Sequence, residues 1–274
     1  MPKTKYHCEV CDVGYATEKE AIECEERHEA ESVVIDGKRL AKAISQVYPC
    51  LSRHAVGNGA LEHILFEIKN DLLTLVAADG FMLGISSLEV SLPAGEGLMH
   101  YPEVKEFQKK LRQAEEVKLR VRNGLVFLIK RNGGEEKITL DMEGLIFPDW
   151  RKLFPVSLAK PKTIVTFQAK AMKEALREVK QEWNAAAKLY IEGECIKIVT
   201  EYIDGQEKKE RKEKSIPARI KGEVAKQAFD WQNLRKMVKA LSGEITLKTD
   251  GYSQVALFEQ GRASWLMMPM YANL

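Results

Sequence analysis

The chain has 274 residues, of which 45% are hydrophobic and 30% are charged, and its formal net charge is +2. This length suits about two domains of ordinary size, and the hydrophobic content is enough to give each of them a core. The longest apolar runs fall far short of the roughly 18 residues that a membrane span needs, and residues 1–10 carry no signal-peptide core. We therefore expect a soluble, cytoplasmic protein with no membrane partner.

The small net charge hides an uneven distribution along the chain. Residues 1–33 hold four basic and nine acidic side chains, which is a net charge of −5, so residues 34–274 carry +7. A moderate positive excess of this kind permits contact with nucleic acid.

Three cysteines crowd the N-terminus in the pattern Cys-x2-Cys-x12-Cys-x3-His. Ligands at these positions can close a tetrahedron around zinc. The four ligands would be Cys8, Cys11, Cys24 and His28. The spacing resembles a zinc finger with one His replaced by Cys, and Tyr15 and Ala21 occupy its core positions, so we expect a structural zinc ion in a domain over residues 1–31. Reduced cysteines on a solvated helix are the alternative. Because the helix is acidic and would repel phosphates, a protein-binding role or a place on the outside of a ring is favoured over DNA reading.

After this finger, the same order of elements occurs twice, with turn signals such as Asn123-Gly124 and Asp250-Gly251 between strands. In the first copy we expect helices at 37–49 and 103–113 and strands at 32–37, 63–69, 72–79, 80–90, 117–122, 125–131 and 136–142. In the second copy we expect helices at 169–183 and 231–241, a charged loop at 205–214, and strands at 163–168, 188–193, 195–204, 215–222, 223–229, 244–249, 253–260 and 263–269. Residues 143–162 link the copies. The pattern indicates an α+β fold.

The four helices after the finger share a second pattern, a row of basic residues beside an apolar face. The basic positions are Lys38, Lys42, Lys105, Lys109, Arg112, Lys173, Arg177, Lys180, Arg235 and Lys239. A solvated helix face explains any one of these rows. The same arrangement at matching places in both copies favours a shared anionic partner, which would be duplex DNA bound through its phosphates without regard to sequence.

Three short stretches resemble the beta sliding clamp of bacterial DNA polymerase III. They are "LFEIKNDLLTLVAADGFMLG" (65–84), "LIFPDWRKLFP" (145–155) and "WLMMPM" (265–270), in the same order and spacing. The resemblance covers about residues 32–274. It implies two sliding-clamp domains of antiparallel sheet plus paired helices, at 32–144 and 145–274, which are similar to the middle and C-terminal domains of that family.

The resemblance implies a processivity factor that encircles double-stranded DNA and tethers DNA polymerase and clamp-loader peptides. A two-domain chain would need three copies for a six-domain ring, so a homotrimer is expected, in a bacterial cell or a phage-infected cell. We expect no enzyme, because no triad, paired-carboxylate or phosphate-loop arrangement is found. The alternatives are a clamp-like adaptor that forms no ring and a zinc-finger DNA-associated regulator whose β-rich body dimerises.

The resemblance also implies an apolar groove for partner peptides, where the terminal strand packs beside the linker and the "AADGFML" segment. The matching residues are Leu61, Ala78, Phe81, Leu83, Pro148, Leu153, Leu266, Met268, Pro269 and Met270. Simple core positions are the alternative for these residues. Phe81 and Met82 stand where the family usually has His and Arg, so the groove is expected to be more apolar here. Flexible methionines suit a surface that accepts several partner sequences.

Overall fold

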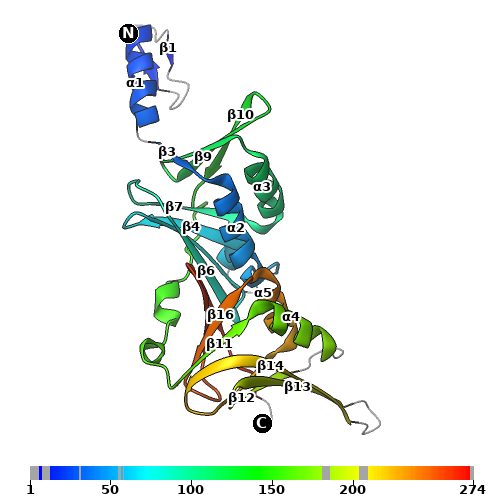
Figure 1. Ribbon diagram of the computed structural model, residues 1–274. Helices are drawn as coiled ribbons and strands as arrows, with labels where there is room; N and C mark the ends of the chain where they lie inside the picture. The colour runs from blue at the N-terminus through cyan, green and yellow to red at the C-terminus, as the bar shows by residue number, and fades with distance from the viewer. Residues whose placement is uncertain are drawn as a thin grey trace.

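The computed structural model describes residues 6–7, 13–30, 32–54, 57, 59–180, 186–203 and 209–271, with only the backbone described at 25–30, 202–203 and 209–210. A small N-terminal module lies at one end of an elongated body (Figure 1). The body consists of two repeated units placed end to end, which we call clamp units after the sequence resemblance. The first clamp unit runs from β3 to β10, and the second clamp unit runs from β11 to β18.

The N-terminal module is an antiparallel strand pair followed by a helix. The strands are β1 (Tyr6–His7) and β2 (Gly14–Tyr15), and the helix is α1 (Glu18–Ala30). The helix begins with a reciprocal capping box, because Thr17 Oγ1 accepts the Glu20 N–H at 3.3 Å and Glu20 Oε2 accepts the Thr17 N–H at 3.1 Å. This capping box fixes the start of the acidic helix.

Each clamp unit repeats the order strand, helix, three strands twice. The first clamp unit contains β3 (Val33–Ile35), α2 (Gly37–Val47), η1 (Tyr48–Cys50), η2 (Gly59–Glu62), β4 (His63–Lys69), β5 (Leu72–Ala78), β6 (Met82–Glu89), β7 (Gly95–His100), α3 (Tyr101–Gln113), β8 (Glu116–Val121), β9 (Leu125–Arg131) and β10 (Gly134–Leu140). After the linker turns η3 (Trp150–Leu153) and η4 (Val156–Ala159), the second clamp unit contains β11 (Thr163–Gln168), α4 (Ala169–Glu178), β12 (Ala186–Glu192), β13 (Cys195–Ile203), β14 (Lys209–Gly222), β15 (Ala225–Asp230), α5 (Trp231–Ala240), β16 (Glu244–Thr249), β17 (Ala256–Gln260) and β18 (Ala263–Met267).

Local sequence signals start the helices of the two units. Asp36 caps α2 by accepting the N–H groups of Lys38 and Arg39, and Asp230 caps α5 by accepting the Asn233 N–H. Such side-chain caps satisfy backbone donors that have no partner inside the helix. In α3 the first turn contains Pro102, which has no N–H to satisfy there.

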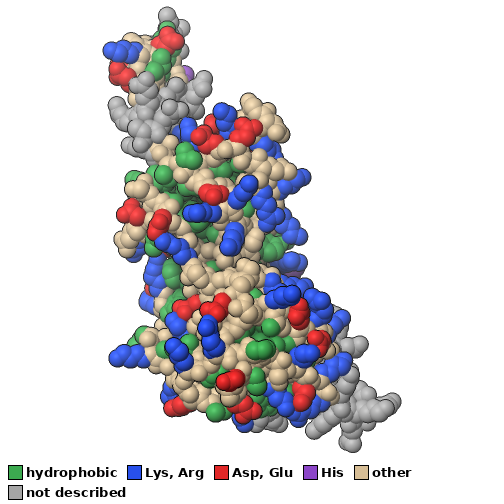
Figure 2. Space-filling view, in the orientation of Figure 1, with side chains coloured by type: hydrophobic (Ala, Val, Ile, Leu, Met, Phe, Trp, Pro, Cys, Tyr) green, Lys and Arg blue, Asp and Glu red, His purple; other side chains and the backbone are tan. Residues whose placement is uncertain are grey.

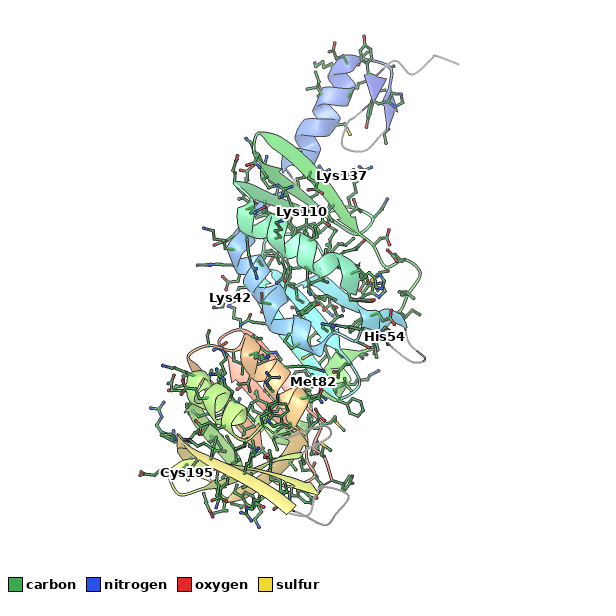
Figure 3. The ribbon with its side chains drawn as sticks, turned by 90° about the vertical axis from the view of Figure 1, so that its right-hand side faces the viewer. Lys42, His54, Met82, Lys110, Lys137 and Cys195 are labelled. Carbon is green, nitrogen blue, oxygen red and sulfur yellow. The ribbon has the colours of Figure 1, made fainter. Side chains whose placement is uncertain are left out.

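The strands form a long antiparallel layer, and the four helices of the body cover one side of it (Figures 1 and 3). Among the described residues the body contains a four-stranded sheet, ordered β10-β9-β8-β3, and a twelve-stranded sheet. The order of the larger sheet is β15-β12-β13-β14-β11-β16-β17-β18-β6-β5-β4-β7. The linker with η3 and η4 lies on the side away from the helices (Figure 1).

Alternation along the strands divides the apolar residues between the two faces of the sheet. In β5, Leu73 and Leu75 pack with the helices, whereas Val76 belongs to a separate cluster under the linker. The helix side is a continuous core through both clamp units, and the linker side is closed by residues such as Phe147 and Trp150. The sheet therefore separates a helix layer from a smaller apolar cluster at the linker.

The apolar run near the C-terminus is an interior strand. Strand β18 pairs with β17 on one side and with β6 of the first clamp unit on the other, with Met267 opposite Met82 and Leu266 opposite Leu83. The Trp265 side chain is completely buried, and its Nε1 donates to the Gln46 carbonyl oxygen at 2.8 Å. This strand pair joins the two clamp units into one sheet and places the terminal strand beside the "AADGFML" segment, as the sequence resemblance implied.

Several boundaries differ from the sequence prediction, and three of them have a clear physical meaning. The predicted helix 37–49 ends at Val47, and the chain continues as a 3-10 turn that contains Pro49, because proline cannot donate the next helical hydrogen bond. The predicted helix 169–183 ends at Glu178, and 181–185 lie outside the described residues. The predicted loop 205–214 is in part a strand, since β14 begins at Lys209. Charged side chains of this strand pair with opposite charges on the neighbouring strand. For example, Lys197 Nζ of β13 lies 3.3 Å from Glu213 Oε1.

The sequence prediction also missed strand β7. Its two glycines lower the strand propensity of "GEGLMH". The structure gives Gly97 a packing role, because a Cβ atom there would lie 2.5 Å from the Leu140 carbonyl oxygen. Strand β7 therefore needs a residue without a side chain where the end of β10 crosses it.

No helix within the described ranges is both long and apolar enough to cross a bilayer.

Candidate functional site

The helix side of the body carries exposed Lys and Arg side chains from all four helices, and they gather along the right-hand edge of the space-filling view (Figure 2). We call this surface the basic helix layer and define it by the exposed residues Lys38, Lys42, Lys105, Lys109, Arg112, Arg177 and Lys239. Lys42 projects outward from α2 (Figure 3). The fold thus brings basic positions from four separate helices onto one face.

Most cations of the basic helix layer are not neutralised by the protein. Among the described residues, no carboxylate lies within 4.0 Å of the charged nitrogens of Lys38, Lys42, Lys105, Lys109, Arg177 or Lys239. By contrast, Lys110 on α3 contacts Glu136 at 2.6 Å and Glu106 at 2.9 Å. The hydrogen bond to Glu136 raises the pKa of Lys110 most, and the hydrogen bond to Glu106 raises it further. The unpaired cations are the ones available to an anionic ligand.

Four of the predicted basic positions differ in their surroundings. Lys173 is half-buried, and its Nζ donates to the Leu241 carbonyl oxygen at 2.6 Å, so this ammonium stabilises the end of α5. The Arg235 guanidinium lies 5.1 Å from the centre of the Trp231 ring. Arg112 Nη2 donates to Ser45 Oγ at 3.2 Å but remains exposed.

The fourth position, Lys180, is exposed but lies beyond the end of α4. Its basic side chain therefore extends the α4 row past the helix itself. Of the ten predicted positions, Lys173 departs furthest from the pattern, because its half-buried ammonium donates to a backbone carbonyl oxygen at the end of another helix.

On the other side of the sheet, an apolar groove opens between the two clamp units. It is a cavity of about 120 Å³ lined by Ala78, Gly80, Phe81, Met82, Leu83, Leu153, Val255, Leu266 and Met268. Phe81, Leu153 and Met268 are 66%, 54% and 50% exposed, whereas Leu83 and Leu266 are buried. Exposed large apolar side chains around a buried apolar floor are typical of a binding groove.

The turn between β5 and β6 forms one wall of the groove. Asp79 Oδ1 accepts the N–H groups of Phe81 and Met82 at 2.9 and 2.8 Å, and Gly80 supplies the positive φ of 89° that the turn requires. Burial raises the pKa of Asp79, although these hydrogen bonds oppose the rise. The Met268 N–H donates to the Phe81 carbonyl oxygen at 2.9 Å, which fixes the chain end against this turn.

The opposite wall comes from the linker. Arg151 pairs with Glu67 of β4, and its guanidinium lies 4.2 Å from the centre of the Trp150 ring. Trp150 in turn packs edge-on against Phe154. These contacts hold η3 against the sheet and place Leu153 at the groove.

The structure brings together six of the ten predicted groove residues. Ala78, Phe81, Leu83, Leu153, Leu266 and Met268 line the cavity. Leu61 packs against the apolar cluster below it. Pro148, Pro269 and Met270 are half-buried outside the lining, and the Met270 N–H donates to the Ala228 carbonyl oxygen at 2.7 Å. The prediction missed Gly80 and Val255. Met82, which was expected to make the groove more apolar, lines it as well. Gly80 and Met82 lie in the "AADGFML" segment, whereas Val255 had no local signal.

The predicted zinc site is described only in part. Cys24 is buried on α1, and its Sγ accepts the Tyr15 hydroxyl at 3.0 Å. Ala21 is buried as well, which agrees with a small core in this module. Cys8, Cys11 and the His28 side chain lie outside the described residues. No group of three metal-binding side chains is found among the described ones.

No protein-family model matches the sequence, and no curated protein matches it. Solved structures do match in fold. The DNA polymerase III subunit beta from Pseudomonas aeruginosa has a TM-score of 0.74 at 17% identity, over 88% of this chain and 66% of that one. The beta subunit from Thermotoga maritima has a TM-score of 0.72 at 19% identity, with the same coverage. The C. crescentus beta sliding clamp has a TM-score of 0.74 at 15% identity, over 88% and 65%.

The chain therefore spans just under two thirds of the length of these clamps. At this level of identity the match concerns the fold. Both clamp units take part in it, because the match covers 88% of this chain. The chain has the α+β fold of the bacterial sliding clamps, with large antiparallel sheets on one side and helices on the other.

Proposed function

We propose that this protein is a DNA sliding clamp that encircles duplex DNA and tethers a polymerase or other replication and repair proteins. The observation that carries the proposal is the basic helix layer, where four helices of both clamp units present unpaired cations on one face. A protein that slides must contact phosphates in many equivalent registers and needs no base contacts. A continuous basic face without a recognition element fits that requirement.

We further propose that three chains close the ring. The units join within the chain through β6 and β18, each the last strand of a strand-helix-three-strand repeat. The last strands of the other two repeats are β10 and β14. Within the described residues, β10 pairs only with β9, and residues 209–217 of β14 pair only with β13. Pairing β10 of one copy with β14 of the next would cover both open edges.

The groove is proposed to bind a short linear peptide from a polymerase or a clamp loader. Its exposed apolar side chains would enclose one or two large apolar anchors of such a peptide. Phe81 and Met82 give this wall an apolar character. Partner peptides with apolar side chains at that wall are therefore expected to bind better than peptides with acidic ones.

The experiment that tests the clamp function compares retention on closed circular and linear DNA. A ring loaded on a circle stays bound through a high-salt wash, whereas it slides off a linear duplex of the same sequence. Light scattering in parallel should give three times the 31.0 kDa chain mass. Equal loss from both DNAs, together with a stable monomer at micromolar concentration, would instead favour the adaptor.

Removing residues 268–274 is expected to abolish peptide binding, because Met268 forms part of the groove wall. Fluorescence anisotropy with peptides selected from a display library on the intact protein would measure this. Met268→Ala should weaken binding by about 1 kcal/mol or more, since truncating an interface anchor typically costs this much. Tyr271→Ala is the matched control, because Tyr271 is 92% exposed and outside the lining. Undiminished binding by the truncated chain would place the peptide site elsewhere.

We also propose that Cys8, Cys11, Cys24 and His28 hold one structural zinc ion. Cys24→Ser should release the metal, because thiolate ligation is strong only when all four ligands converge. The clamp body should remain folded, which circular dichroism can check. Cys195→Ser, in the second clamp unit, is the control and should leave the metal content unchanged. Native protein without zinc by elemental analysis would disprove the site.

A further inference from the structure

A second cavity lies at the junction of the two clamp units. It has a volume of about 710 Å³ and is lined by Tyr48, Pro49, Leu51, Ser52, Arg53, His54, Asp79, Lys236 and Lys239. The first unit contributes η1, the loop after it and the β5–β6 turn, and the second unit contributes α5. Figure 3 shows His54 toward the end of the first unit that adjoins the second. The cavity therefore exists only because the two units are joined.

Positive charge dominates the lining of this cavity. Arg53, Lys236 and Lys239 oppose the one carboxylate of Asp79, which gives +2 with His54 neutral. The Asp79 carboxylate already accepts two backbone N–H groups through Oδ1. Lys236 Nζ donates to Asn233 Oδ1 at 3.3 Å, and no described carboxylate lies within 4.0 Å of it or of the charged groups of Arg53 and Lys239.

Several cations of the strands of the second clamp unit do have an acidic neighbour. Lys248 Nζ lies 2.7 Å from Glu259 Oε2, Lys214 Nζ lies 2.8 Å from Glu178 Oε2, and Arg219 pairs with Glu244 at 2.6 Å. A concave site lined by one sign of charge focuses the field and raises the local concentration of counter-ions. Unpaired cations from two units around one hollow thus indicate an anion site.

We propose that this junction cavity binds a phosphate group. Lys and the planar fork of Arg are the usual protein donors to phosphate oxygens, and the Tyr48 and Ser52 hydroxyls in the lining can donate as well. Lys239 also belongs to the basic helix layer, so the cavity adjoins that surface. One source of the phosphate is the DNA backbone, and this assignment rests on the proposed function. A free nucleotide or inorganic phosphate is the other source.

The first experiment tests the pocket without DNA. Inorganic phosphate is titrated into the full-length protein at constant ionic strength, and the ring resonance of His54, assigned with His54→Gln, is followed by NMR. The resonance should move saturably with phosphate but not with chloride. Arg53→Gln/Lys236→Gln should abolish the shift, and Lys69→Gln/Lys130→Gln, which removes two exposed lysines from the strands, should retain it. A linear response, or a saturable one that survives Arg53→Gln/Lys236→Gln, would overturn the proposal.

The second experiment identifies the source of the phosphate. The salt dependence of affinity for a short duplex is compared between the same two variants. The slope of log K against log salt should fall by about one for each DNA phosphate that Arg53→Gln/Lys236→Gln no longer binds, and should be unchanged in the control. An unchanged slope together with a saturable phosphate shift would assign the cavity to free phosphate compounds. Failure of all DNA binding would contradict the clamp function but leave the phosphate titration valid.

Discussion

Trp265→Ala is expected to lower the free energy of unfolding by about 3–5 kcal/mol, the usual range for removing a buried Trp from a core. Trp265 is completely buried at the strand pair that joins the clamp units, and its indole N–H donates to Gln46 of α2. The substitution therefore leaves a cavity and removes a hydrogen bond between the units. Thermal unfolding at fixed protein concentration measures the loss, because any oligomer makes the midpoint depend on concentration.

Two comparisons make this result specific. Trp265→Phe keeps much of the ring volume and should be milder, losing chiefly the hydrogen bond to the Gln46 carbonyl. Tyr271→Ala removes an aromatic side chain that is 92% exposed and should stay within about 0.5 kcal/mol of the wild type. If Trp265→Ala were as mild as Tyr271→Ala, the packing between β18, β6 and α2 would be less tight than the structure shows.

Lys42→Gln/Lys105→Gln/Lys109→Gln is expected to reduce affinity for duplex DNA by roughly 10²-fold to 10³-fold at 0.1 M salt, if each lysine contacts one phosphate. The physical reason is counterion release, which contributes about 0.9 to the salt slope for each phosphate contact. The slope should therefore fall by roughly three. All three lysines are exposed on α2 or α3, without a carboxylate partner among the described residues.

The matched control is Lys69→Gln/Lys130→Gln/Lys221→Gln, which removes the same charge from exposed strand positions. It should leave both affinity and slope close to the wild type, apart from a small effect of net charge. Fluorescence anisotropy with a labelled duplex at several salt concentrations measures both quantities. Unchanged retention of the helix variant on closed circular DNA would mean that the basic helix layer is only a solvated surface.

Much of the fold could be read from the sequence, because local patterns decide which residues face the core. The period of α3 places Val104, Phe107 and Leu111 on the buried face, and the structure buries all three. The short apolar runs at 72–79 and 125–131 likewise predicted strands that the structure contains. The resemblance of the "AADGFML", linker and C-terminal stretches indicated the region of the groove, and six of the predicted residues line it.

Other features could not be read from local patterns. Strand β7 depends on the close approach of Leu140 to Gly97, and these residues are far apart in the sequence. Lys173 has the spacing of a solvent-facing cation, but its ammonium meets the carbonyl at the end of another helix. In both cases a contact with a distant element decides the outcome.

The sequence by itself determined which faces of the helices and strands are apolar, where most turns lie and which side chains are basic, because these properties repeat over a few residues. Only the tertiary structure decided that β18 lies between β17 and β6 and that the two units share one sheet. It also created the junction cavity, where Arg53, Asp79 and Lys236 come from elements that no local pattern connects. Sites of this kind depend on how the units are joined, because packing brings together the chain segments that form their walls.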